Sequence, residues 1–360
     1  MMKKRVLAVV MAAMLAMGAL AGCGSKDTKE TAKSETKAAE TKSETTAAET
    51  KKEETTAAAA DGETVKIGVI QLAEHPALDA SYQGFVDALK EAGYEEGKNL
   101  ELDFNNAQGD TSNCETIATK LVNNQSDLIL AIATPAAQAA AGKTTDIPII
   151  ATAVTDFVAA GLADSDEAPG ANVSGSSDMN PIAEQIDLMT ELLPDAKKVG
   201  IMYCSSEDNS IVQAEIAKEV CTEKGLEPVE FTVSDSSMVQ SVAESMIGKV
   251  DAVYIPTDNL LAEAMSTVSM VTNPNGLPCI VGEEGMVVNG GLATYGLEYY
   301  ALGKLAGQMA VEVLNGADVS KMPVQHISAE DCALSVNSEA AKELGVSRDA
   351  VMDRAKDVAQ

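Results

Sequence analysis

The sequence predicts an α/β protein made of two lobes, each with a parallel β-sheet between layers of helices. Three observations lead to this prediction. The chain has 360 residues, of which 46% are hydrophobic, enough to form two cores. From residue 64 onward, short runs rich in valine and isoleucine alternate with amphipathic segments of helical length, which is typical of buried parallel strands and their connecting helices. The same alternation starts twice, which indicates two units of similar construction.

The expected strands and helices follow one another in regular order. Strands are expected at residues 65–70, 100–104, 128–131, 149–152, 199–203, 230–233, 252–255 and 279–281. Helices are expected at residues 78–91, 112–123, 135–141, 181–193, 211–224, 238–247, 260–270 and 300–314. The first helix of each series ends in a glycine-containing turn, EAGY at 91–94 and EKGL at 223–226. The segment 170–180 has many turn residues and few core residues, so we expect it to join the lobes.

The first 23 residues have the pattern of an export signal, with a basic start, an apolar stretch at 6–19, and LAGC at 20–23. LAGC resembles a bacterial lipobox, which implies that Cys23 is lipidated and anchors the mature protein to the membrane. The alternative is an ordinary secretory signal with an incidental cysteine. Residues 24–62 consist largely of Lys, Glu, Thr, Ser and Ala, so we expect a disordered tether there.

The composition argues against several classes of partner. With 26 basic and 55 acidic residues, the chain is strongly acidic, so no nucleic-acid partner is expected. Besides Cys23 there are five cysteines, at 114, 204, 221, 279 and 332, without any CxxC pair, which argues against a zinc ribbon or a disulfide framework. Cys204 and Cys279 are expected to be small core residues, although one oxidised pair outside the cell remains an alternative. We expect a monomer.

The sequence also lacks the patterns of a catalytic site. It contains only two histidines, His75 and His326, and neither a GxSxG elbow nor an HExxH pair. The GKT at 142–144 lacks the earlier glycine that a phosphate-binding loop requires. We therefore predict a binding protein rather than an enzyme, with no cofactor and no metal.

Small polar residues follow six of the expected strands. In an open parallel sheet the carboxyl ends of the strands form the ligand-binding edge, and two such edges facing each other form a cleft. Each residue taken alone also fits a helix cap, which is the competing interpretation. The candidate cleft residues are Leu72, Glu74, Thr134, Pro135, Ala136, Thr155, Asp156, Phe157, Ser206, Asn209, Thr257, Asp258, Asn259 and Glu283.

Several segments together resemble a known family. They are residues 75–110, 129–139 (ILAIATPAAQA), 149–162, 172–181 (NVSGSSDMNP), 199–210, 253–259 (VYIPTDN) and 290–316. In order and spacing they are similar to the substrate-binding lipoproteins of ABC transporters whose known members include tryptophan-binding and other aromatic-amino-acid-binding proteins. The resemblance implies a type I periplasmic-binding-protein fold, in which two Rossmann-like lobes are joined by three hinge crossings. It implies a first lobe of residues 63–178 plus about 295–319, and a second lobe of 179–294 plus about 320–360.

The resemblance also implies a function. The protein is expected to capture a small amino acid, aromatic or apolar, such as tryptophan, phenylalanine or tyrosine, on the outer face of the cell membrane. It would deliver this ligand to an ABC permease and its ATPase. The alternatives are a ligand sensor for a membrane receptor, or a binding protein for another small solute such as a nucleoside or a short peptide.

An amino-acid ligand presents a carboxylate and an ammonium group. We expect the carboxylate at the start of the helix that follows residue 133, where Pro135 would be the first helical residue and the N–H groups of Ala136 and Ala137 would face the cleft beside the Thr134 hydroxyl. The candidate partners of the ammonium are Asp258, Asn259 and Asp156. The expected side-chain pocket is formed by Leu72, Tyr82, Phe157 and either Met202 or Tyr203. Relatives tend to have proline in place of Phe157, which could either stack on an aromatic ligand or fill its space.

Overall fold

The computed structural model describes residues 64–347 and 349–359. Cys23, the expected signal peptide and the expected tether lie outside the described residues. Among the helices of the described part, none is long and apolar enough to cross a membrane.

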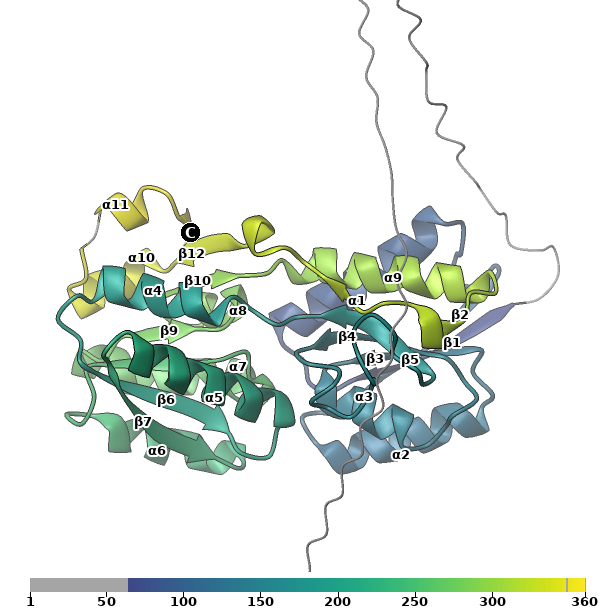
Figure 1. Ribbon diagram of the computed structural model, residues 1–360, viewed down its shortest axis with the longest axis horizontal. Helices are drawn as coiled ribbons and strands as arrows, with labels where there is room; N and C mark the ends of the chain where they lie inside the picture. The colour runs from purple at the N-terminus through teal and green to yellow at the C-terminus, as the bar shows by residue number, and fades with distance from the viewer. Residues whose placement is uncertain (1–63, 348, 360) are drawn as a thin grey trace, which may run out of the picture. The chain divides into compact units, whose positions relative to one another are not determined.

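The first lobe is built on a six-stranded parallel sheet with the order β11-β5-β4-β3-β1-β2 in the described part of the chain. Its strands are β1 (Val65–Gln71), β2 (Leu100–Asn106), β3 (Leu128–Ile132), β4 (Ile149–Val154), β5 (Val173–Ser177) and β11 (Gln325–His326). Helices α1 (Pro76–Glu91) and α9 (Tyr299–Leu314) pack together on one face, and α2 (Thr111–Asn123) and α3 (Thr134–Ala141) cover the other (Figure 1). The apolar strands β3 and β4 are buried along their whole length between these layers.

The second lobe is built on a seven-stranded sheet with the order β13-β12-β10-β9-β8-β6-β7 over the same described residues. All its pairs are parallel except β10 with β12. Its strands are β6 (Lys198–Cys204), β7 (Glu227–Val233), β8 (Ala252–Ile255), β9 (Cys279–Val281), β10 (Ala293–Gly296), β12 (Ala333–Val336) and β13 (Lys356–Asp357). Its α-helices are α4 (Ile182–Leu192), α5 (Asp208–Glu223), α6 (Val239–Met246), α7 (Asn259–Thr272), α8 (Glu284–Val288), α10 (Ser338–Leu344) and α11 (Asp349–Met352). Helix α4 packs against α5, and α6 packs against α7.

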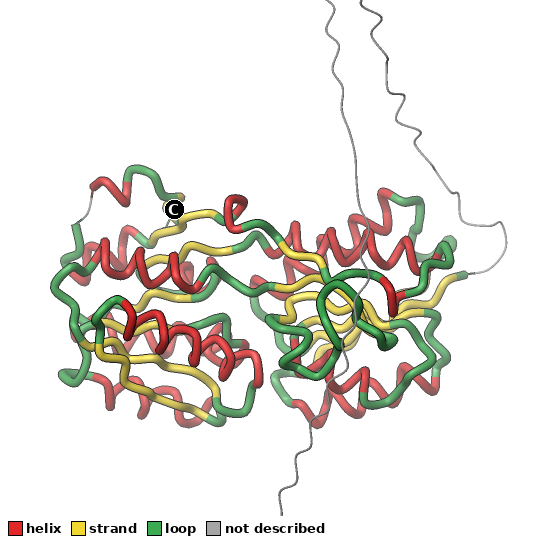
Figure 2. Tube along the Cα trace, in the orientation of Figure 1, coloured by secondary structure: helices red, strands yellow, loops and turns green. Residues whose placement is uncertain are grey.

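The chain passes three times between the two sheets, which confirms the predicted fold class (Figure 2). The crossings lie at residues 178–181 between β5 and α4, at 297–298 between β10 and α9, and at 327–332 between β11 and β12. Two expected boundaries differ from these positions. Tyr295 still belongs to β10, which pairs with β9 and β12, and β11 returns to pair with β5 of the first sheet. The second and third crossings therefore come later in the chain than residues 295 and 320.

The expectation for residues 170–180 was correct only at the end of the segment, where the first crossing begins at residue 178. Instead of a loop, Val173–Ser177 forms β5, a strand that is buried along its whole length. A Cβ atom on Gly175 would lie 1.8 Å from the carbonyl oxygen of Ala151. Because β4 approaches β5 so closely, this position of β5 requires glycine. The same composition of serine and glycine is typical of turns, which explains the error.

The eight expected strands and the eight expected helices are all present, with ends displaced by a few residues. The prediction omitted β5, β10 to β13 and the short helices α8, α10 and α11. Helix α3 begins at Thr134, so Pro135 is its second residue and not its first. The five cysteines from Cys114 to Cys332 are buried and unpaired, with Cys204 and Cys279 in one hydrophobic core of the second lobe.

Candidate functional site

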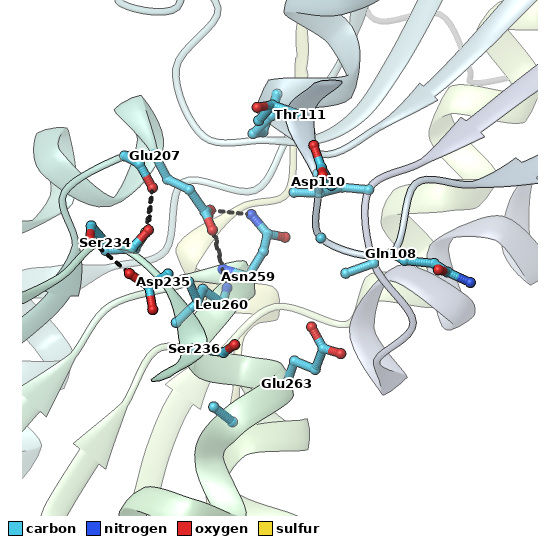
Figure 3. A pocket seen from close by; sticks show the side chains of 17 residues that line it. Gln108, Asp110, Thr111, Glu207, Ser234, Asp235, Ser236, Asn259, Leu260 and Glu263 are labelled. Carbon is cyan, nitrogen blue, oxygen red and sulfur yellow. Dashed lines mark hydrogen bonds between the residues drawn. The ribbon is translucent and has the colours of Figure 1, made fainter. Parts of the chain in front are cut away.

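A cavity of about 650 Å³ lies between the carboxyl ends of strands from both sheets. The first lobe contributes the loops that follow β1 and β2 and the start of α3, and the second contributes the loops that follow β6, β7 and β8. Figure 3 shows Gln108, Asp110 and Thr111 of the first lobe opposite Glu207 and Asn259 of the second. The lining residues are Leu72, Ala73, Gln108, Gly109, Asp110, Thr111, Pro135, Cys204, Ser206, Glu207, Ser234, Asp235, Ser236, Asn259, Leu260, Glu263 and Ala264.

The charges of this cavity are all of one sign. Four carboxylates line it, those of Asp110, Glu207, Asp235 and Glu263, and none of its lining residues is Lys, Arg or His. Walls of one sign focus the field inside a cleft, so this cavity favours cationic groups. Any carboxylate of a ligand must be bound by neutral donors.

Neutral donors are available at the start of α3. Thr134 is buried, and its hydroxyl oxygen has no hydrogen-bond partner among the described residues. The N–H group of Ala137 donates to the carbonyl of Ala133 and is therefore occupied, contrary to expectation. The N–H group of Ala136 has no partner in the described part of the chain. The hydroxyl of Thr134, this amide and the positive end of the helix dipole together suit an anion.

Two strained alanines lie next to the threonines of the first lobe. Ala133 has φ 84° and Ala153 has φ 55°, and both values are uncommon for residues other than glycine. Ala133 directly precedes Thr134, and Ala153 forms an irregularity in β4 two residues before Thr155. Strained backbone of this kind is often found at ligand-binding sites, where the surrounding structure holds it in place.

The first two hinge crossings meet at a buried carboxylate, Asp178. Its Oδ1 accepts a hydrogen bond of 3.0 Å from the hydroxyl of Thr155, and its Oδ2 accepts one of 2.8 Å from the hydroxyl of Tyr299. Burial raises the pKa of Asp178 above its ordinary value. Since an ionised carboxylate can accept about four hydrogen bonds, Asp178 has room for a further donor.

Polar side chains of the second lobe extend this network. The Nε2 of Gln213 donates to the carbonyl of Thr257 at 2.8 Å and to the hydroxyl of Thr155 at 3.4 Å. The amide of Asn180, in the first crossing, donates to the hydroxyl of Thr257 at 3.0 Å. These contacts connect Thr155 and Thr257, two predicted site residues from opposite lobes.

Glu207 is a buried carboxylate that lines the cavity, whereas Asp178 does not line it. Its Oε2 accepts a hydrogen bond of 2.6 Å from the amide of Asn259, and its Oε1 accepts one from the N–H of Leu260. Asn209 lies beside it, and the Oδ1 of Asn209 is buried without a partner in the described residues. The structure therefore brings together Asn209 and Asn259, two of the predicted site residues, beside Glu207.

Asp258 does not have the geometry expected of a partner for an ammonium group. It is completely buried, and its two oxygens accept hydrogen bonds from the N–H groups of Cys204 and Leu261, so that it caps α7. Burial, followed by the charge of Glu207, raises its pKa to about 7. Glu283 is similar, since it caps α8 through the N–H groups of Gly285 and Met286, and burial raises its pKa to about 7. For both residues the capping interpretation fits the structure.

Of the predicted site residues, Leu72, Pro135, Ser206 and Asn259 line the cavity, and the others do not. Glu74 is exposed, and Asp156 is half-buried and accepts the N–H of Ala159 within its own turn. Phe157 is completely buried in the hydrophobic core of the first lobe. Ser206 lines the cavity but is exposed, and its hydroxyl donates to the carbonyl of Ser234.

Of the residues expected to form the side-chain pocket, only Leu72 lines the cavity. Tyr82 packs on the ring of Phe104 at a centroid distance of 4.7 Å. Met202 is a core residue, and the hydroxyl of Tyr203 donates to Glu230.

Sequence reasoning missed Asp178, Asn180, Gln213 and Tyr299, and it noted His75 only as a poor catalytic candidate. Asp178 and Asn180 lie in the segment that was interpreted as a join rich in turn residues, although DMN directly follows four small residues, SGSS. Tyr299 is 121 residues from Asp178 in the chain, so no local pattern connects the two. An acidic residue in a predicted crossing was the one available signal.

Asp258 and Glu283 lead to a prediction about stability and pH. Their carboxyl groups titrate near pH 4 in the unfolded chain and near pH 7 in the folded protein. Because their folded pKa values are raised, the stability that they contribute is fully present below pH 4 and is lost as the pH rises to about 7. We expect the unfolding temperature of the ligand-free protein to fall between pH 5 and pH 8, measured by calorimetry at constant ionic strength. Glu283→Gln should flatten this dependence, and an unfolding temperature that rises with pH would contradict the assignment.

Comparison with known proteins places this site in context. The sequence model of a family described as ABC transporter substrate binding protein matches residues 66–359. The chain is 40% identical over 349 residues to a tyrosine-binding protein of Clostridioides difficile (strain R20291), which covers 96% of this chain and 93% of that protein. It is similar to a crystal structure from Streptococcus pneumonia described as an ABC domain in complex with L-Trp, with 38% identity, a TM-score of 0.79, and coverage of 81% of this chain and 99% of that one.

A third comparison concerns the arrangement of the lobes. The ligand-free, open structure of a substrate-binding protein with adhesive properties from Clostridium difficile is 44% identical but has a TM-score of only 0.64, covering 82% of this chain and 99% of that one. The more identical sequence thus gives the poorer superposition. A chain whose lobes lie closer together than in that open structure would produce this order of scores. Two hydrogen bonds between the lobes, from Gln138 to Asp208 at 2.9 Å and between His75 and Asn259 at 3.4 Å, agree with such an arrangement.

Proposed function

The chain belongs to the family of ABC transporter substrate-binding proteins, and from this premise we propose that it captures an aromatic amino acid, tyrosine or tryptophan, between its two lobes. The similar proteins described as binding tyrosine and L-Trp support this choice of ligand. The cleft supports it independently, because its polar groups complement a zwitterion.

One observation carries the proposal. Among the described residues, the buried carboxylates are Asp178, Glu207, Asp258 and Glu283, and none of them forms an ion pair with Lys or Arg. All four lie in the loops at the facing strand ends or in the hinge. A buried carboxylate without a cation is costly, and an ammonium group of a ligand would offset that cost.

Of these carboxylates, Asp178 is the best partner for the ammonium. The oxygens of Glu207, Asp258 and Glu283 are engaged by backbone or amide N–H groups that form part of helix caps. Asp178 accepts hydrogen bonds from two side-chain hydroxyls and from its own backbone N–H, caps no helix, and lies in the first crossing. We therefore propose that Asp178, with Thr155 beside it, binds the ammonium group. This assignment replaces the expected partners Asp258, Asn259 and Asp156.

The ligand carboxylate is assigned to the start of α3, with the Thr134 hydroxyl and the N–H of Ala136 as donors. Strands β3 and β4 are neighbours in the sheet, so Thr134 and Thr155 project from adjacent strand ends. We propose that these neighbouring strand ends hold the two charged groups of one α-amino acid. The second lobe adds Asn209 and Asn259 only when it lies against the first, so the ligand favours the closed arrangement.

The proposal extends to the setting of the protein. An ABC permease and its ATPase would receive the ligand on the extracytoplasmic side of the membrane, as the family implies. Lipidation of Cys23 and a tether of residues 24–62 would hold a monomer near that permease. Loss of membrane association in a Cys23→Ala variant would support the anchor, and retention of full membrane association would exclude it.

A thermal-shift panel on the purified, ligand-free protein tests the choice of ligand. We expect tyrosine and tryptophan to raise the unfolding temperature, because a ligand at a hundredfold its dissociation constant adds about 2.7 kcal/mol to stability. Aspartate and glutamate should give no shift, since the cavity has no cation for a second carboxylate. A response to nucleosides or dipeptides without any response to aromatic amino acids would reject the proposal.

A further inference from the structure

His75 is a buried histidine at the edge of the cleft with one ring nitrogen unused. It is the N-cap residue of α1, is only 6% exposed, and is followed by Pro76, which has no N–H group. His75 does not itself line the cavity, but Ala73, two residues before it, does, and so does Asn259, its hydrogen-bond partner across the cleft. Its Nδ1 is buried and has no partner among the described residues.

The hydrogen bonds around His75 determine where its proton lies. The amide nitrogen of Asn259 donates to Glu207 at 2.6 Å, so the amide oxygen of Asn259 is the atom that faces the Nε2 of His75 at 3.4 Å. That oxygen can only accept, so Nε2 must carry the proton. Burial lowers the pKa of His75, which keeps the ring neutral. The unused Nδ1 therefore presents a lone pair that accepts a hydrogen bond.

Gln71, at the end of β1, has a second unused acceptor. Its amide nitrogen donates to the carbonyl of Ala73 and to the carboxylate of Asp79, which fixes the orientation of the amide. Its Oε1 is buried without a partner in the part of the chain that the structure describes. The end of β1 and the loop that follows it thus hold two buried acceptors, and neither has a donor among the described residues. A buried acceptor left unpaired is unfavourable, which points to a donor on the ligand.

We propose that His75 accepts a hydrogen bond from the side chain of the ligand, either the phenol hydroxyl of tyrosine or the indole N–H of tryptophan. This inference rests on the proposed function and adds a determinant of specificity to it. Phenylalanine has no such donor, so its binding leaves Nδ1 buried and unpaired. A site that binds a donor group rejects an analogue that lacks it more strongly than an apolar pocket rejects a change in size.

Titration calorimetry with tyrosine, tryptophan and phenylalanine tests this role. We expect the wild-type protein to prefer tyrosine to phenylalanine by about tenfold to a hundredfold, the range given by leaving one buried group unpaired. In His75→Leu this preference should fall to about threefold or less, while the affinity for phenylalanine changes little. His326→Leu is the matched control, because His326 is the other histidine of the sequence, is exposed and contacts Asp166. It should keep the wild-type preference.

Two analogues test the same contact without a mutation. The compound 4-fluorophenylalanine has nearly the shape of tyrosine without its O–H donor, and 1-methyltryptophan lacks the indole N–H. Both should bind the wild type at least about tenfold more weakly than their parent amino acids.

Three results would overturn the inference. The first is equal binding of 4-fluorophenylalanine and tyrosine. The second is a folded His75→Leu variant that keeps the full preference for tyrosine. The third is an equal loss of affinity for all three amino acids in His75→Leu, which would assign His75 to the shared α-amino-acid group. If the wild type binds none of the three amino acids, the proposed function itself fails. That result differs from the three above, in each of which the wild type still binds.

Discussion

Replacing Asp178 with Asn is expected to weaken binding of tyrosine or tryptophan by about a hundredfold or more. Removing one partner of a buried, hydrogen-bonded charge pair typically costs about 2–5 kcal/mol, and about 1.4 kcal/mol is tenfold in affinity. Asparagine keeps the size of the side chain and one oxygen acceptor. The hydroxyls of Thr155 and Tyr299 can rotate and accept hydrogen bonds from its amide nitrogen. The change therefore removes the charge and retains most of the network.

Stability should change in the opposite direction in the same variant. Burial raises the pKa of Asp178, so the ionised carboxylate destabilises the ligand-free protein at neutral pH. The free Asp178→Asn protein should unfold at the same temperature as the wild type or at a higher one. Weak binding together with retained stability separates a ligand contact from a structural role. Calorimetric titration and thermal unfolding of the same samples provide both measurements.

Asp156→Asn is the control for this variant. Asp156 was the sequence-based candidate on the first lobe, and it is half-buried in its own turn. We expect its replacement to change the affinity for tyrosine less than about threefold, because Asp156 only caps its own turn near the surface. Strong loss of binding in Asp156→Asn with little loss in Asp178→Asn would reverse the assignment and restore the original candidate.

The fold was predictable because its core strands are apolar and its helices are amphipathic. Strands such as β3 and β4 consist of consecutive buried residues, so their positions are clear from hydrophobicity alone. Strand β5 was missed since its residues are small, and their size is determined by a neighbouring strand and not by their own sequence. The returning elements β11 and α9 are placed by tertiary contacts, which no local pattern records.

The candidate site was predictable only in part. Polar residues after parallel strands indicated the edge of both sheets at which the cavity lies, and Thr134, Thr155, Asn209 and Thr257 follow strands at that edge. Asp258 was misassigned because capping aspartates and ligand-binding aspartates have the same local sequence, and only the two N–H groups on its oxygens distinguish them. Asp178 lies in the first crossing and Tyr299 directly after the second, so their pairing required the structure.

The second large effect is expected at Gly303, in the contact between α1 and α9. A Cβ atom on Gly303 would lie 1.9 Å from the carbonyl oxygen of Ser81, so Gly303→Ala forces two helix backbones apart. We expect a loss of about 3 kcal/mol or more, and an unfolding temperature lower by roughly 6–12 °C. In an isolated helix the same change would stabilise by about 1 kcal/mol, so the sign of the effect tests the contact.

The contact between α1 and α9 also positions a residue of the proposed ammonium site. The hydroxyl of Ser81 donates to the carbonyl of Tyr299, and the hydroxyl of Tyr299 donates to Asp178, so moving α9 displaces a group on the proposed ammonium site. Gly303→Ala should therefore weaken tyrosine binding even at temperatures where the protein remains folded. Gln308→Ala, at an exposed position of the same helix, is the control and should leave both stability and affinity nearly unchanged. An unfolding temperature for Gly303→Ala at or above that of the wild type would mean that α9 does not pack closely on α1, and Tyr299 would lose its role in positioning Asp178.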